Sequence, residues 1–256
     1  KLGAKRLVLA RELNLKQIKE ISKIIDLEVF GHGAMCVSVS GRCFMSQFLF
    51  NQSANRGKCI QPCRRPYTVK DDQGKSLKMT NHHIFSAKDL CTLPFIEKLK
   101  KAGITTFKIE GRNREPEYID TVVRVYKKAL NKKLTKQEIK QGMEELNKVY
   151  TKGFSSGFLL KSPTSDDFSN IDHSKATQKK QFIGKISHYY PKISVAQLKL
   201  NNGPLKIDDK ILIMGKTTGL VRHKITSMEI KNKSIKTAKK GQEIAVKIPF
   251  CRKGDE

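Results

Sequence analysis

Short apolar runs alternate with amphipathic stretches along the first 150 residues of the chain. Such runs are typical of buried parallel strands, and the stretches between them carry apolar residues at the spacing of one helix face. The expected strands are residues 6–10, 27–30, 84–86 and 105–109, and the expected helices start after Asn14 and at residues 92, 116 and 135. Asn14 is a favourable N-cap, Gly103 ends the second helix, and Pro116 suits a first turn. This repetition predicts an α/β fold with a parallel sheet.

The pattern changes after about residue 160. Residues 161–180 are polar and lack periodicity, so we interpret them as a linker. From residue 182 onward, short strand-like segments separated by turns predict a small β-barrel domain. The expected strands are residues 183–189, 193–200, 210–214, 221–229 and 243–248. The predicted organisation is a partial (β/α) barrel over 1–160, a linker over 161–180 and a small β-barrel over 181–256.

The four strand–helix units make half of a closed (β/α) barrel, which requires eight. The first strand also begins only a few residues after Lys1. Two interpretations follow: a small open sheet, or the C-terminal half of a TIM-like (β/α) barrel whose first half is missing. A half barrel exposes a sheet edge, so this interpretation predicts a longer chain or a second chain that completes the barrel.

Charge narrows the class of partner. Lysine and arginine total 51 against 24 acidic residues, which gives a net charge of +27. An excess of this size favours a polyanion such as RNA or DNA, whereas a merely lysine-rich proteome would normally raise glutamate too. Tryptophan is absent and aromatic residues make up 7%, so a stacking platform for single strands is not obvious. No apolar run approaches a membrane span and no signal peptide is visible, so we expect a cytoplasmic protein without membrane contact.

Five of the six cysteines lie between residues 36 and 91. They follow the spacing C-x6-C-x15-C-x3-C, with a fifth after 27 more residues, and are Cys36, Cys43, Cys59, Cys63 and Cys91. Clustered cysteines in a long chain without a signal peptide favour metal or redox chemistry over disulfides.

Four thiolates satisfy either an iron–sulfur cluster or a tetrahedral zinc ion. Zinc sites usually consist of two tight cysteine pairs, and only Cys59 and Cys63 form one, so the spacing favours the cluster with zinc as the alternative. The other alternative is a buried small side chain, which is the expectation for Cys251.

Polar residues follow several predicted strands at the point where each ends. They are Arg11, Glu12, His32, Lys88, Asp89, Glu110 and Arg112. Because the carboxyl ends of parallel strands build the active site in βα folds, we expect these side chains to converge on one pocket with the cysteines. The alternative for each of them alone is a solvated loop. The candidates for general acid–base chemistry are His32, Asp89 and Glu110.

Peptidase motifs are scarce in the chain. It contains no HExxH motif, and the GxSxG spacing occurs at residues 153–157, within a turn-rich segment that does not predict the strand-to-helix elbow of a serine hydrolase. A Cys36–His32 pair is conceivable as a nucleophile and base, but it competes with the cluster for Cys36.

Several segments closely resemble the signature of the collagenase-like peptidase family U-32. Residues 28–46 have the pattern E-V-F-x-x-G-A-M-C-x4-G-R-C-x-x-S and residues 55–64 have N-R-G-x-C-x-Q-P-C-R. Residues 86–91 (S-x-K-D-L-C), 107–112 (F-K-I-E-G-R) and 153–158 continue the likeness. The resemblance runs from about residue 5 to 160. It implies the C-terminal half of a TIM-like barrel, and the domain after it looks like the second, β-barrel domain of elongation factor Tu.

The better-characterised relatives in this family resemble oxygen-independent hydroxylases. They hold a 4Fe-4S cluster and act on uridine in tRNA, cytidine in ribosomal RNA or a ubiquinone precursor, with prephenate implied as oxygen source for the RNA and quinone branches. The Gln61–Arg64 and Lys88–Cys91 segments look most like the tRNA branch, which makes 5-hydroxyuridine at the wobble position. The resemblance implies Cys36, Cys43 and Cys59 as ligands, with Cys91 favoured over Cys63 as the fourth.

Three hypotheses remain from the sequence. The first is an iron–sulfur RNA hydroxylase, in which the candidate substrate-binding residues are Arg11, Glu12, Arg42, Arg64, Lys88 and Arg112. Arginines among them suit the carboxylates of a prephenate-like donor. The second is a collagenase-like peptidase. The third is a non-catalytic RNA-binding half of a split enzyme.

Overall fold

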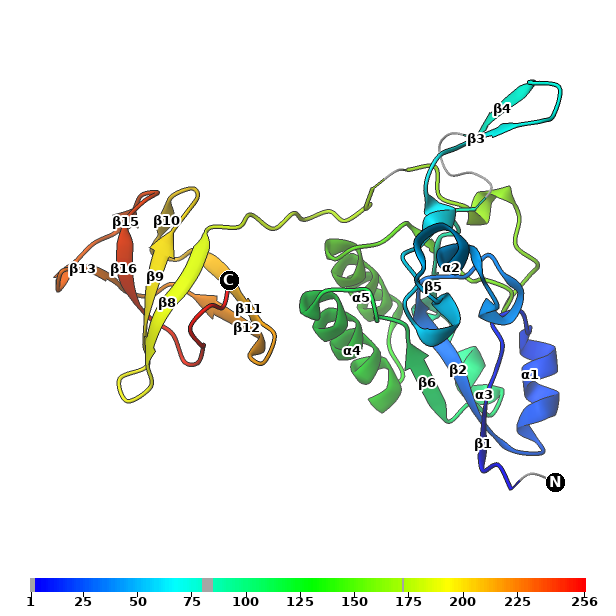
Figure 1. Cartoon of the computed structure of the whole chain (residues 1–256). Helices are drawn as coiled ribbons and strands as arrows, with labels where there is room; N and C mark the ends of the chain where they lie inside the picture. Colours follow the sequence, from blue (N-terminus) through cyan, green and yellow to red (C-terminus); the bar gives the residue numbers. More distant parts are fainter. Residues whose placement is uncertain (1–2, 80–84, 172) are drawn as a thin grey trace. The chain divides into compact units, whose positions relative to one another are not determined.

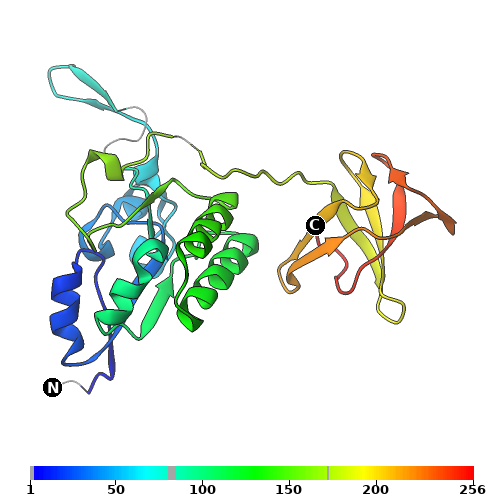
Figure 2. The same ribbon diagram turned by 180° about the vertical axis from the view of Figure 1, so that it is seen from behind.

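The computed structural model describes residues 3–79, 85–171 and 173–256, with the side chain of Met79 left out. The chain divides into two compact units, Lys1–Gln178 and Lys179–Glu256. Figures 1 and 2 show an α/β first unit and a second unit built from strands. The α/β fold predicted for the first half is therefore confirmed.

The sheet of the first unit centres on β2 (Asp26–Gly33). Its neighbours are β1 (Arg6–Val8), β5 (Asp89–Cys91) and β6 (Thr106–Ile109), and β7 (Phe154–Ser155) pairs with β5. β1 and β6 run parallel to β2, as predicted, and β7 runs parallel to β5. β5, however, runs antiparallel to β2, with His32 opposite Cys91. Neighbouring strands of a (β/α) barrel are all parallel, so this contact departs from the barrel pattern and the half barrel stays a prediction.

Four helices pack against this sheet: α1 (Leu15–Ser22), α3 (Ile96–Lys101), α4 (Pro116–Asn131) and α5 (Lys136–Lys148). The caps expected from the sequence are present. The side chain of Asn14 accepts the N–H of Gln17, and Pro116 opens α4. The helix expected from residue 92 starts later, at Ile96, because Pro94 lies in a 3-10 turn over Leu93–Phe95.

Two apolar clusters hold the first unit together. One joins α1, β2 and α3 through residues such as Ile18, Leu27 and Leu99. The other joins α4 and α5 to the start of α3 through Tyr126, Leu146 and others. These clusters fix the ends of β2, β5 and β6 in place, which positions the loops that follow them.

A long excursion between β2 and β5 carries four of the cysteines. It contains α2 (Met45–Phe50), 3-10 turns at Val39–Gly41, Ala54–Arg56 and Pro62–Arg64, and the hairpin of β3 (Tyr67–Lys70) and β4 (Ser76–Met79). The strand expected at 84–86 begins at Ile84, which lies outside the described residues. Phe85 and Ser86 are not in a strand, and the nearest strand, β5, starts at Asp89.

The segment interpreted as a linker belongs to the first unit as far as residue 178. Its backbone is hydrogen-bonded to distant parts of that unit: Ser169 N–H donates to Ser86 O at 2.7 Å, and Lys175 N–H donates to Thr151 O at 2.7 Å. These contacts join residues that are far apart in the sequence, so they produce no periodic pattern within the segment.

The second unit is all-β with one apolar core. Its largest sheet has the order β14-β13-β16-β9-β8, and two further strand pairs are β10 with β15 and β11 with β12. The strands are β8 (Gly184–Tyr190), β9 (Val195–Leu200), β10 (Leu205–Lys206), β11 (Lys210–Gly215), β12 (Gly219–Lys224), β13 (Met228–Ile230), β14 (Lys233–Ser234), β15 (Thr237–Ala238) and β16 (Glu243–Lys247). The segment expected at 221–229 is divided between β12 and β13, and β10, β14 and β15 were not expected. Cys251 lies in this core, 1% exposed, as a small buried side chain.

Among the described residues, no helix is long and apolar enough to cross a membrane.

Candidate functional site

The excursion between β2 and β5 brings four cysteines to the wall of one cavity. Cys36 follows the end of β2, Cys43 precedes α2, and Cys59 and Cys63 flank the turn at Gln61. All four line a cavity of about 440 Å³, and each is half-buried. Sequence spacing predicted this gathering of thiols.

Three of these sulfurs accept a backbone N–H from the residue two positions further on. The donors are Ser38 to Cys36, Met45 to Cys43 and Gln61 to Cys59, each at 3.4 Å. Such hydrogen bonds stabilise negative charge on sulfur, which is the form that binds metals. Gln61 adopts φ +56°, a left-handed conformation that turns the chain between Cys59 and Cys63.

The donor set fits a group held by four thiolates. No three His, Cys, Asp or Glu side chains among the described residues are placed to hold a single metal ion. The four thiols nevertheless share one cavity, and three of them accept a backbone N–H, which stabilises the thiolate form. Burial raises the pKa of Cys63 to about 11, opposed by the positive charge of Arg64.

Cys91, the other contender for a fourth ligand, lies elsewhere. It sits on β5, 3% exposed, within the cluster that includes Leu93 and Val122. Its sulfur lies 3.7 Å from Tyr126 Oη and 3.7 Å from Met143 Sδ. Burial raises its pKa to about 11. The structure thus brings Cys63, and not Cys91, together with Cys36, Cys43 and Cys59.

His32, a predicted acid–base candidate, is buried in an aromatic cage away from the cysteine cavity. It is 1% exposed, and the rings of Tyr118, Tyr126 and Phe154 surround it. Its Nδ1 lies 3.3 Å from Tyr126 Oη. Burial, together with the charge of Arg114, lowers its pKa to about 3, so the ring is neutral at physiological pH. His32 and Cys36 are therefore not arranged as a nucleophile–base pair.

Asp89 and Lys88 are also engaged in structure. The carboxylate of Asp89 is 1% exposed, lies 3.4 Å from Arg114 and accepts the N–H of Lys152 at 3.0 Å. The ammonium of Lys88 donates to the backbone carbonyl of Asp166. Neither side chain lines the cysteine cavity.

Glu110, Arg11 and Arg112 do line the cysteine cavity. The carboxylate of Glu110 accepts the N–H of Arg112 at 3.2 Å and that of Ala34 at 3.4 Å. The guanidinium of Arg11 stacks 3.6 Å above the ring of Phe30. Burial lowers the pKa of Arg11, and the negative charge of Glu110 opposes that shift. These groups form a mixed cationic and anionic wall opposite the cysteine turns.

Arg64 and Arg112 differ in their surroundings: the first is held by hydrogen bonds to the backbone, and the second packs over a glycine. Arg64 is 9% exposed and donates to the carbonyl oxygens of Ala87 at 2.9 Å and Met35 at 3.2 Å, so it ties the cysteine excursion to the chain before β5. Arg112 packs over Gly57, whose φ is +77°, and a Cβ at Gly57 would lie 1.4 Å from Arg112 Nη1. Gly57 is therefore the residue that lets this guanidinium reach the cavity.

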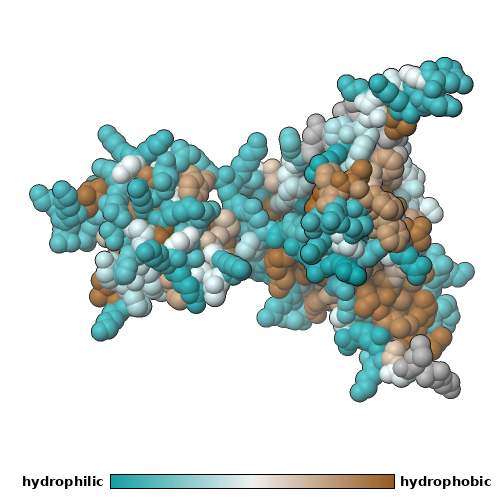
Figure 3. Space-filling model, in the orientation of Figure 1, coloured by the Kyte–Doolittle hydropathy of each residue, from teal (hydrophilic) through white to brown (hydrophobic). Residues whose placement is uncertain are grey.

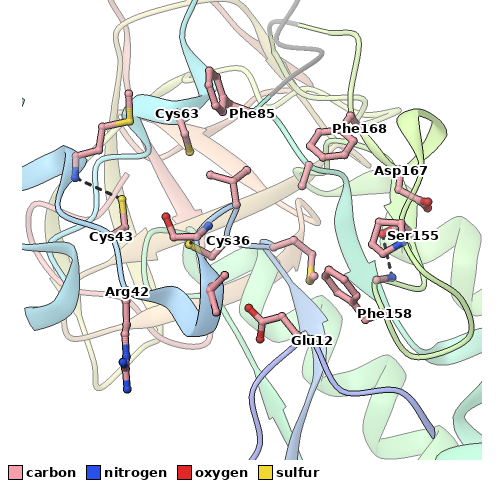
Figure 4. A pocket seen from close by; sticks show the side chains of 18 of the residues that line it. Glu12, Cys36, Arg42, Cys43, Cys63, Phe85, Ser155, Phe158, Asp167 and Phe168 are labelled. Carbon is pink, nitrogen blue, oxygen red and sulfur yellow. Dashed lines mark hydrogen bonds between the residues drawn. The ribbon is translucent and has the colours of Figure 1, made fainter.

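A second cavity of about 580 Å³ adjoins the first. It shares Met35, Cys36, Val37, Cys43 and Cys63 with the first. Its other walls include Glu12, Arg42, Phe85, Phe158 and Phe168 (Figure 4). The three phenylalanines were not predicted, because they are far apart in sequence and meet only through the fold. The turn-rich segment 153–158 was the one available signal for Phe158.

Apolar side chains gather on the surface near these cavities, around α2 (Figure 3). Phe44 is 59% exposed and Phe48 is 83% exposed, with their ring centroids 6.3 Å apart. This aromatic pair was not predicted, because the overall aromatic content of the chain is low.

The family model for peptidase family U32 matches residues 1–169. A collagenase of Porphyromonas gingivalis is 39% identical over 94% of this chain and 62% of its own length. The 23S rRNA 5-hydroxycytidine C2501 synthase of Escherichia coli is 43% identical over 51% of this chain and 20% of its own length. The tRNA hydroxylation protein P1 of Bacillus subtilis is 32% identical over 78% of this chain and 50% of its own length.

The chain thus spans less than two thirds of the length of each of these relatives. The matched family model covers the sheet, the cysteine excursion and both cavities. The chain belongs to peptidase family U32.

Proposed function

We propose that this chain is part of an iron–sulfur-dependent, oxygen-independent RNA hydroxylase. The observation that carries the proposal is the set of four cysteines on one cavity wall, three of them hydrogen-bonded by backbone N–H groups. A 4Fe-4S cluster takes four thiolates. A single zinc ion held by the same thiolates is the alternative.

We propose Cys36, Cys43, Cys59 and Cys63 as the ligands. When bound there, a cluster would supply one-electron chemistry that no side chain of the cavity supplies. The buried position of Cys91 beneath Tyr126 argues for a packing role instead.

RNA is the proposed substrate class. Relatives at 43% and 32% identity are named for hydroxylation of ribosomal RNA and tRNA. A net charge of +27 suits a polyanionic partner, since each phosphate neutralised releases counterions. The finer assignment, wobble uridine of tRNA to 5-hydroxyuridine, is our choice within this class.

The oxygen donor is proposed to be a hydroxylated carboxylate of the prephenate type, held by Arg11 and Arg112 in the cysteine cavity. The reaction balances as an exchange. The pyrimidine C5–H bond breaks and a C5–OH bond forms, while the donor loses its hydroxyl and gains hydrogen. The base is oxidised by two electrons and the donor is reduced by two. Glu110, which lines the same cavity as the donor, would give the donor the proton that replaces its hydroxyl, and the proton released from C5 balances it.

The larger architecture is also part of the proposal. We propose that the first unit is the C-terminal half of a TIM-like barrel, completed by a longer chain or a second chain. The second unit would resemble the second domain of elongation factor Tu and contact RNA. This arrangement is supported by two relatives that are longer than the region they share with this chain, which covers 62% of one and 50% of the other.

The experiment uses the full-length protein purified without oxygen. Iron, acid-labile sulfide and visible absorption test the cluster, and mass spectrometry of nucleosides from cells lacking the gene tests the reaction. Zinc without iron, or unchanged 5-hydroxypyrimidine content in both tRNA and ribosomal RNA, would contradict the proposal.

Proteolysis is the second candidate, because the collagenase-named relative matches 94% of this chain. His32 is buried and lines neither cavity, which argues against a Cys36–His32 pair as the peptidase nucleophile and base. Gelatin zymography of the full-length protein separates the two. Gelatin cleavage that survives replacement of Cys36 and Cys43 by serine would favour a peptidase.

A further inference from the structure

The two cavities that share the cysteine wall differ in the charged side chains that line them. The first has a group of charged residues, Arg11, Lys108, Glu110 and Arg112. The second is walled mainly by aromatic and aliphatic side chains, with Glu12, Arg42 and Asp167 among its few charged groups. A small anion suits the first cavity, whereas a flat, largely uncharged ring suits the second.

Glu12 is the unusual group in the second cavity. Its Oε1 accepts the backbone N–H of Ser40 at 2.6 Å, which fixes the carboxylate. Its Oε2 is buried and has no hydrogen-bond partner among the described residues. A buried oxygen without a donor is costly, so a ligand that brings an N–H to this atom is strongly favoured.

The remaining walls restrict that ligand to a planar group. Figure 4 shows Phe158 and Phe168 on the side opposite Cys43, with Glu12 between the two sides. Aromatic side chains stack on nucleobases, which expose N–H groups at their edges once they leave a helix. The cavity volume of about 580 Å³ lies within the range of small-ligand sites.

We infer that this second cavity receives one pyrimidine base flipped out of the RNA, and that Glu12 Oε2 accepts an N–H from its pairing edge. The hydrogen-bond donor is N3–H in uridine and the N4 amino group in cytidine. The choice of a pyrimidine rests on the proposed function. The base then lies against Cys36, Cys43 and Cys63, the cysteines at which this cavity adjoins the one proposed for the carboxylate donor.

The test compares two RNA stem-loops that differ at one base, uridine or 3-methyluridine, which lacks the N3–H. Binding to the full-length, anaerobically purified protein is measured by fluorescence anisotropy. The wild-type protein should bind the 3-methyluridine loop about 10- to 100-fold more weakly, the range for losing a hydrogen bond to a charged group. In Glu12→Ala, which removes the acceptor and leaves room for the methyl group, the two loops should bind within about twofold of each other.

Glu12→Gln keeps an oxygen for the Ser40 N–H while it replaces the free acceptor with an amide donor. It should bind the uridine loop about 10- to 100-fold more weakly than the wild type even if Glu12→Ala is poorly folded. Glu97→Gln, on α3 and paired with Lys100, is the matched control and should behave as wild type.

Equal binding of the two loops by the wild type, or an unchanged preference in both Glu12 variants, would overturn the inference. So would the absence of measurable binding to either loop. Because the comparison measures binding, it stands apart from the hydroxylation assay. A discriminating protein that yields no 5-hydroxypyrimidine would contradict the proposed function and leave the base cavity supported.

Discussion

Arg114 and Asp89 form an ion pair that is almost fully removed from solvent. Nη2 of Arg114 lies 3.4 Å from Oδ1 of Asp89, and the two side chains are 7% and 1% exposed. The guanidinium also lies 4.1 Å from the ring centroid of Tyr150. This pair joins the loop before α4 to the first residue of β5, so it holds the strand that carries Cys91.

Asp89→Asn should destabilise the protein strongly. The amide keeps an acceptor for the Lys152 N–H but leaves the charge of Arg114 buried without a counterion. Breaking a buried pair in this way typically costs about 3–5 kcal/mol. The free energy of unfolding, measured by urea titration, checks the value. Glu145→Gln, which weakens the more exposed pair with Arg124, should cost at most about 1 kcal/mol, and equal losses in the two variants would contradict the argument.

Stability should fall as pH drops from about 6.5 toward 3, because His32 is buried in its neutral form. Its folded pKa is about 3, whereas the unfolded value is about 6.5. Between these values the unfolded chain binds a proton that the folded chain does not, so acid favours unfolding. The full contribution is on the order of 5 kcal/mol at 1.36 kcal/mol per pH unit. His32→Phe should flatten the pH dependence of the unfolding free energy, and an unchanged slope would count against the assignment.

Cysteine variants should separate Cys63 from Cys91. Cys63→Ser should lose most of the iron and the visible absorption, because serine removes one of the four thiolates on the cavity wall. Cys91→Ser should keep the iron while lowering the free energy of unfolding, since it places a hydroxyl among buried apolar groups. Iron analysis and urea titration of both variants measure this. The opposite pattern would return Cys91 to the ligand set.

Gly57→Ala should disturb the site more than Gly74→Ala does. Both glycines have positive φ, +77° and +81°, so both substitutions carry a backbone cost of about 1 kcal/mol. Only at Gly57 does the added carbon collide with Arg112, while nothing lies within 4 Å at Gly74. The KM for the oxygen donor, measured for the full-length enzyme, should therefore rise several-fold in Gly57→Ala alone. A similar rise in both variants would mean that Arg112 is not the cause.

Local signals in the sequence predicted local structure well. Asn14 was expected to cap a helix and residue 135 to begin one, and the side chains of Asn14 and Thr135 both accept the backbone N–H three residues on. A cap depends on neighbours in the chain, so the sequence contains all the necessary information. The cysteine spacing likewise predicted a cluster of thiols, although Cys63 shares the cavity with Cys36, Cys43 and Cys59 whereas the favoured Cys91 lies apart.

Features that depend on distant residues were not predictable in this way. β5 is only Asp89–Cys91, too short for a periodic pattern, and its direction depends on a pairing with β2 across more than fifty residues. His32 was expected at the pocket because it ends a strand. Its actual surroundings come from Tyr118, Tyr126 and Phe154, which the sequence separates widely.

The backbone N–H groups that bond Cys36, Cys43 and Cys59 each come from the second residue after the cysteine. Contacts this short in sequence close with little entropic cost. The three cysteine turns are therefore set by local backbone contacts. Most of the entropic cost of bringing these turns to one cavity falls on hydrogen bonds between residues far apart in the sequence, such as Arg64 to Met35 O and Asn113 to Cys59 O.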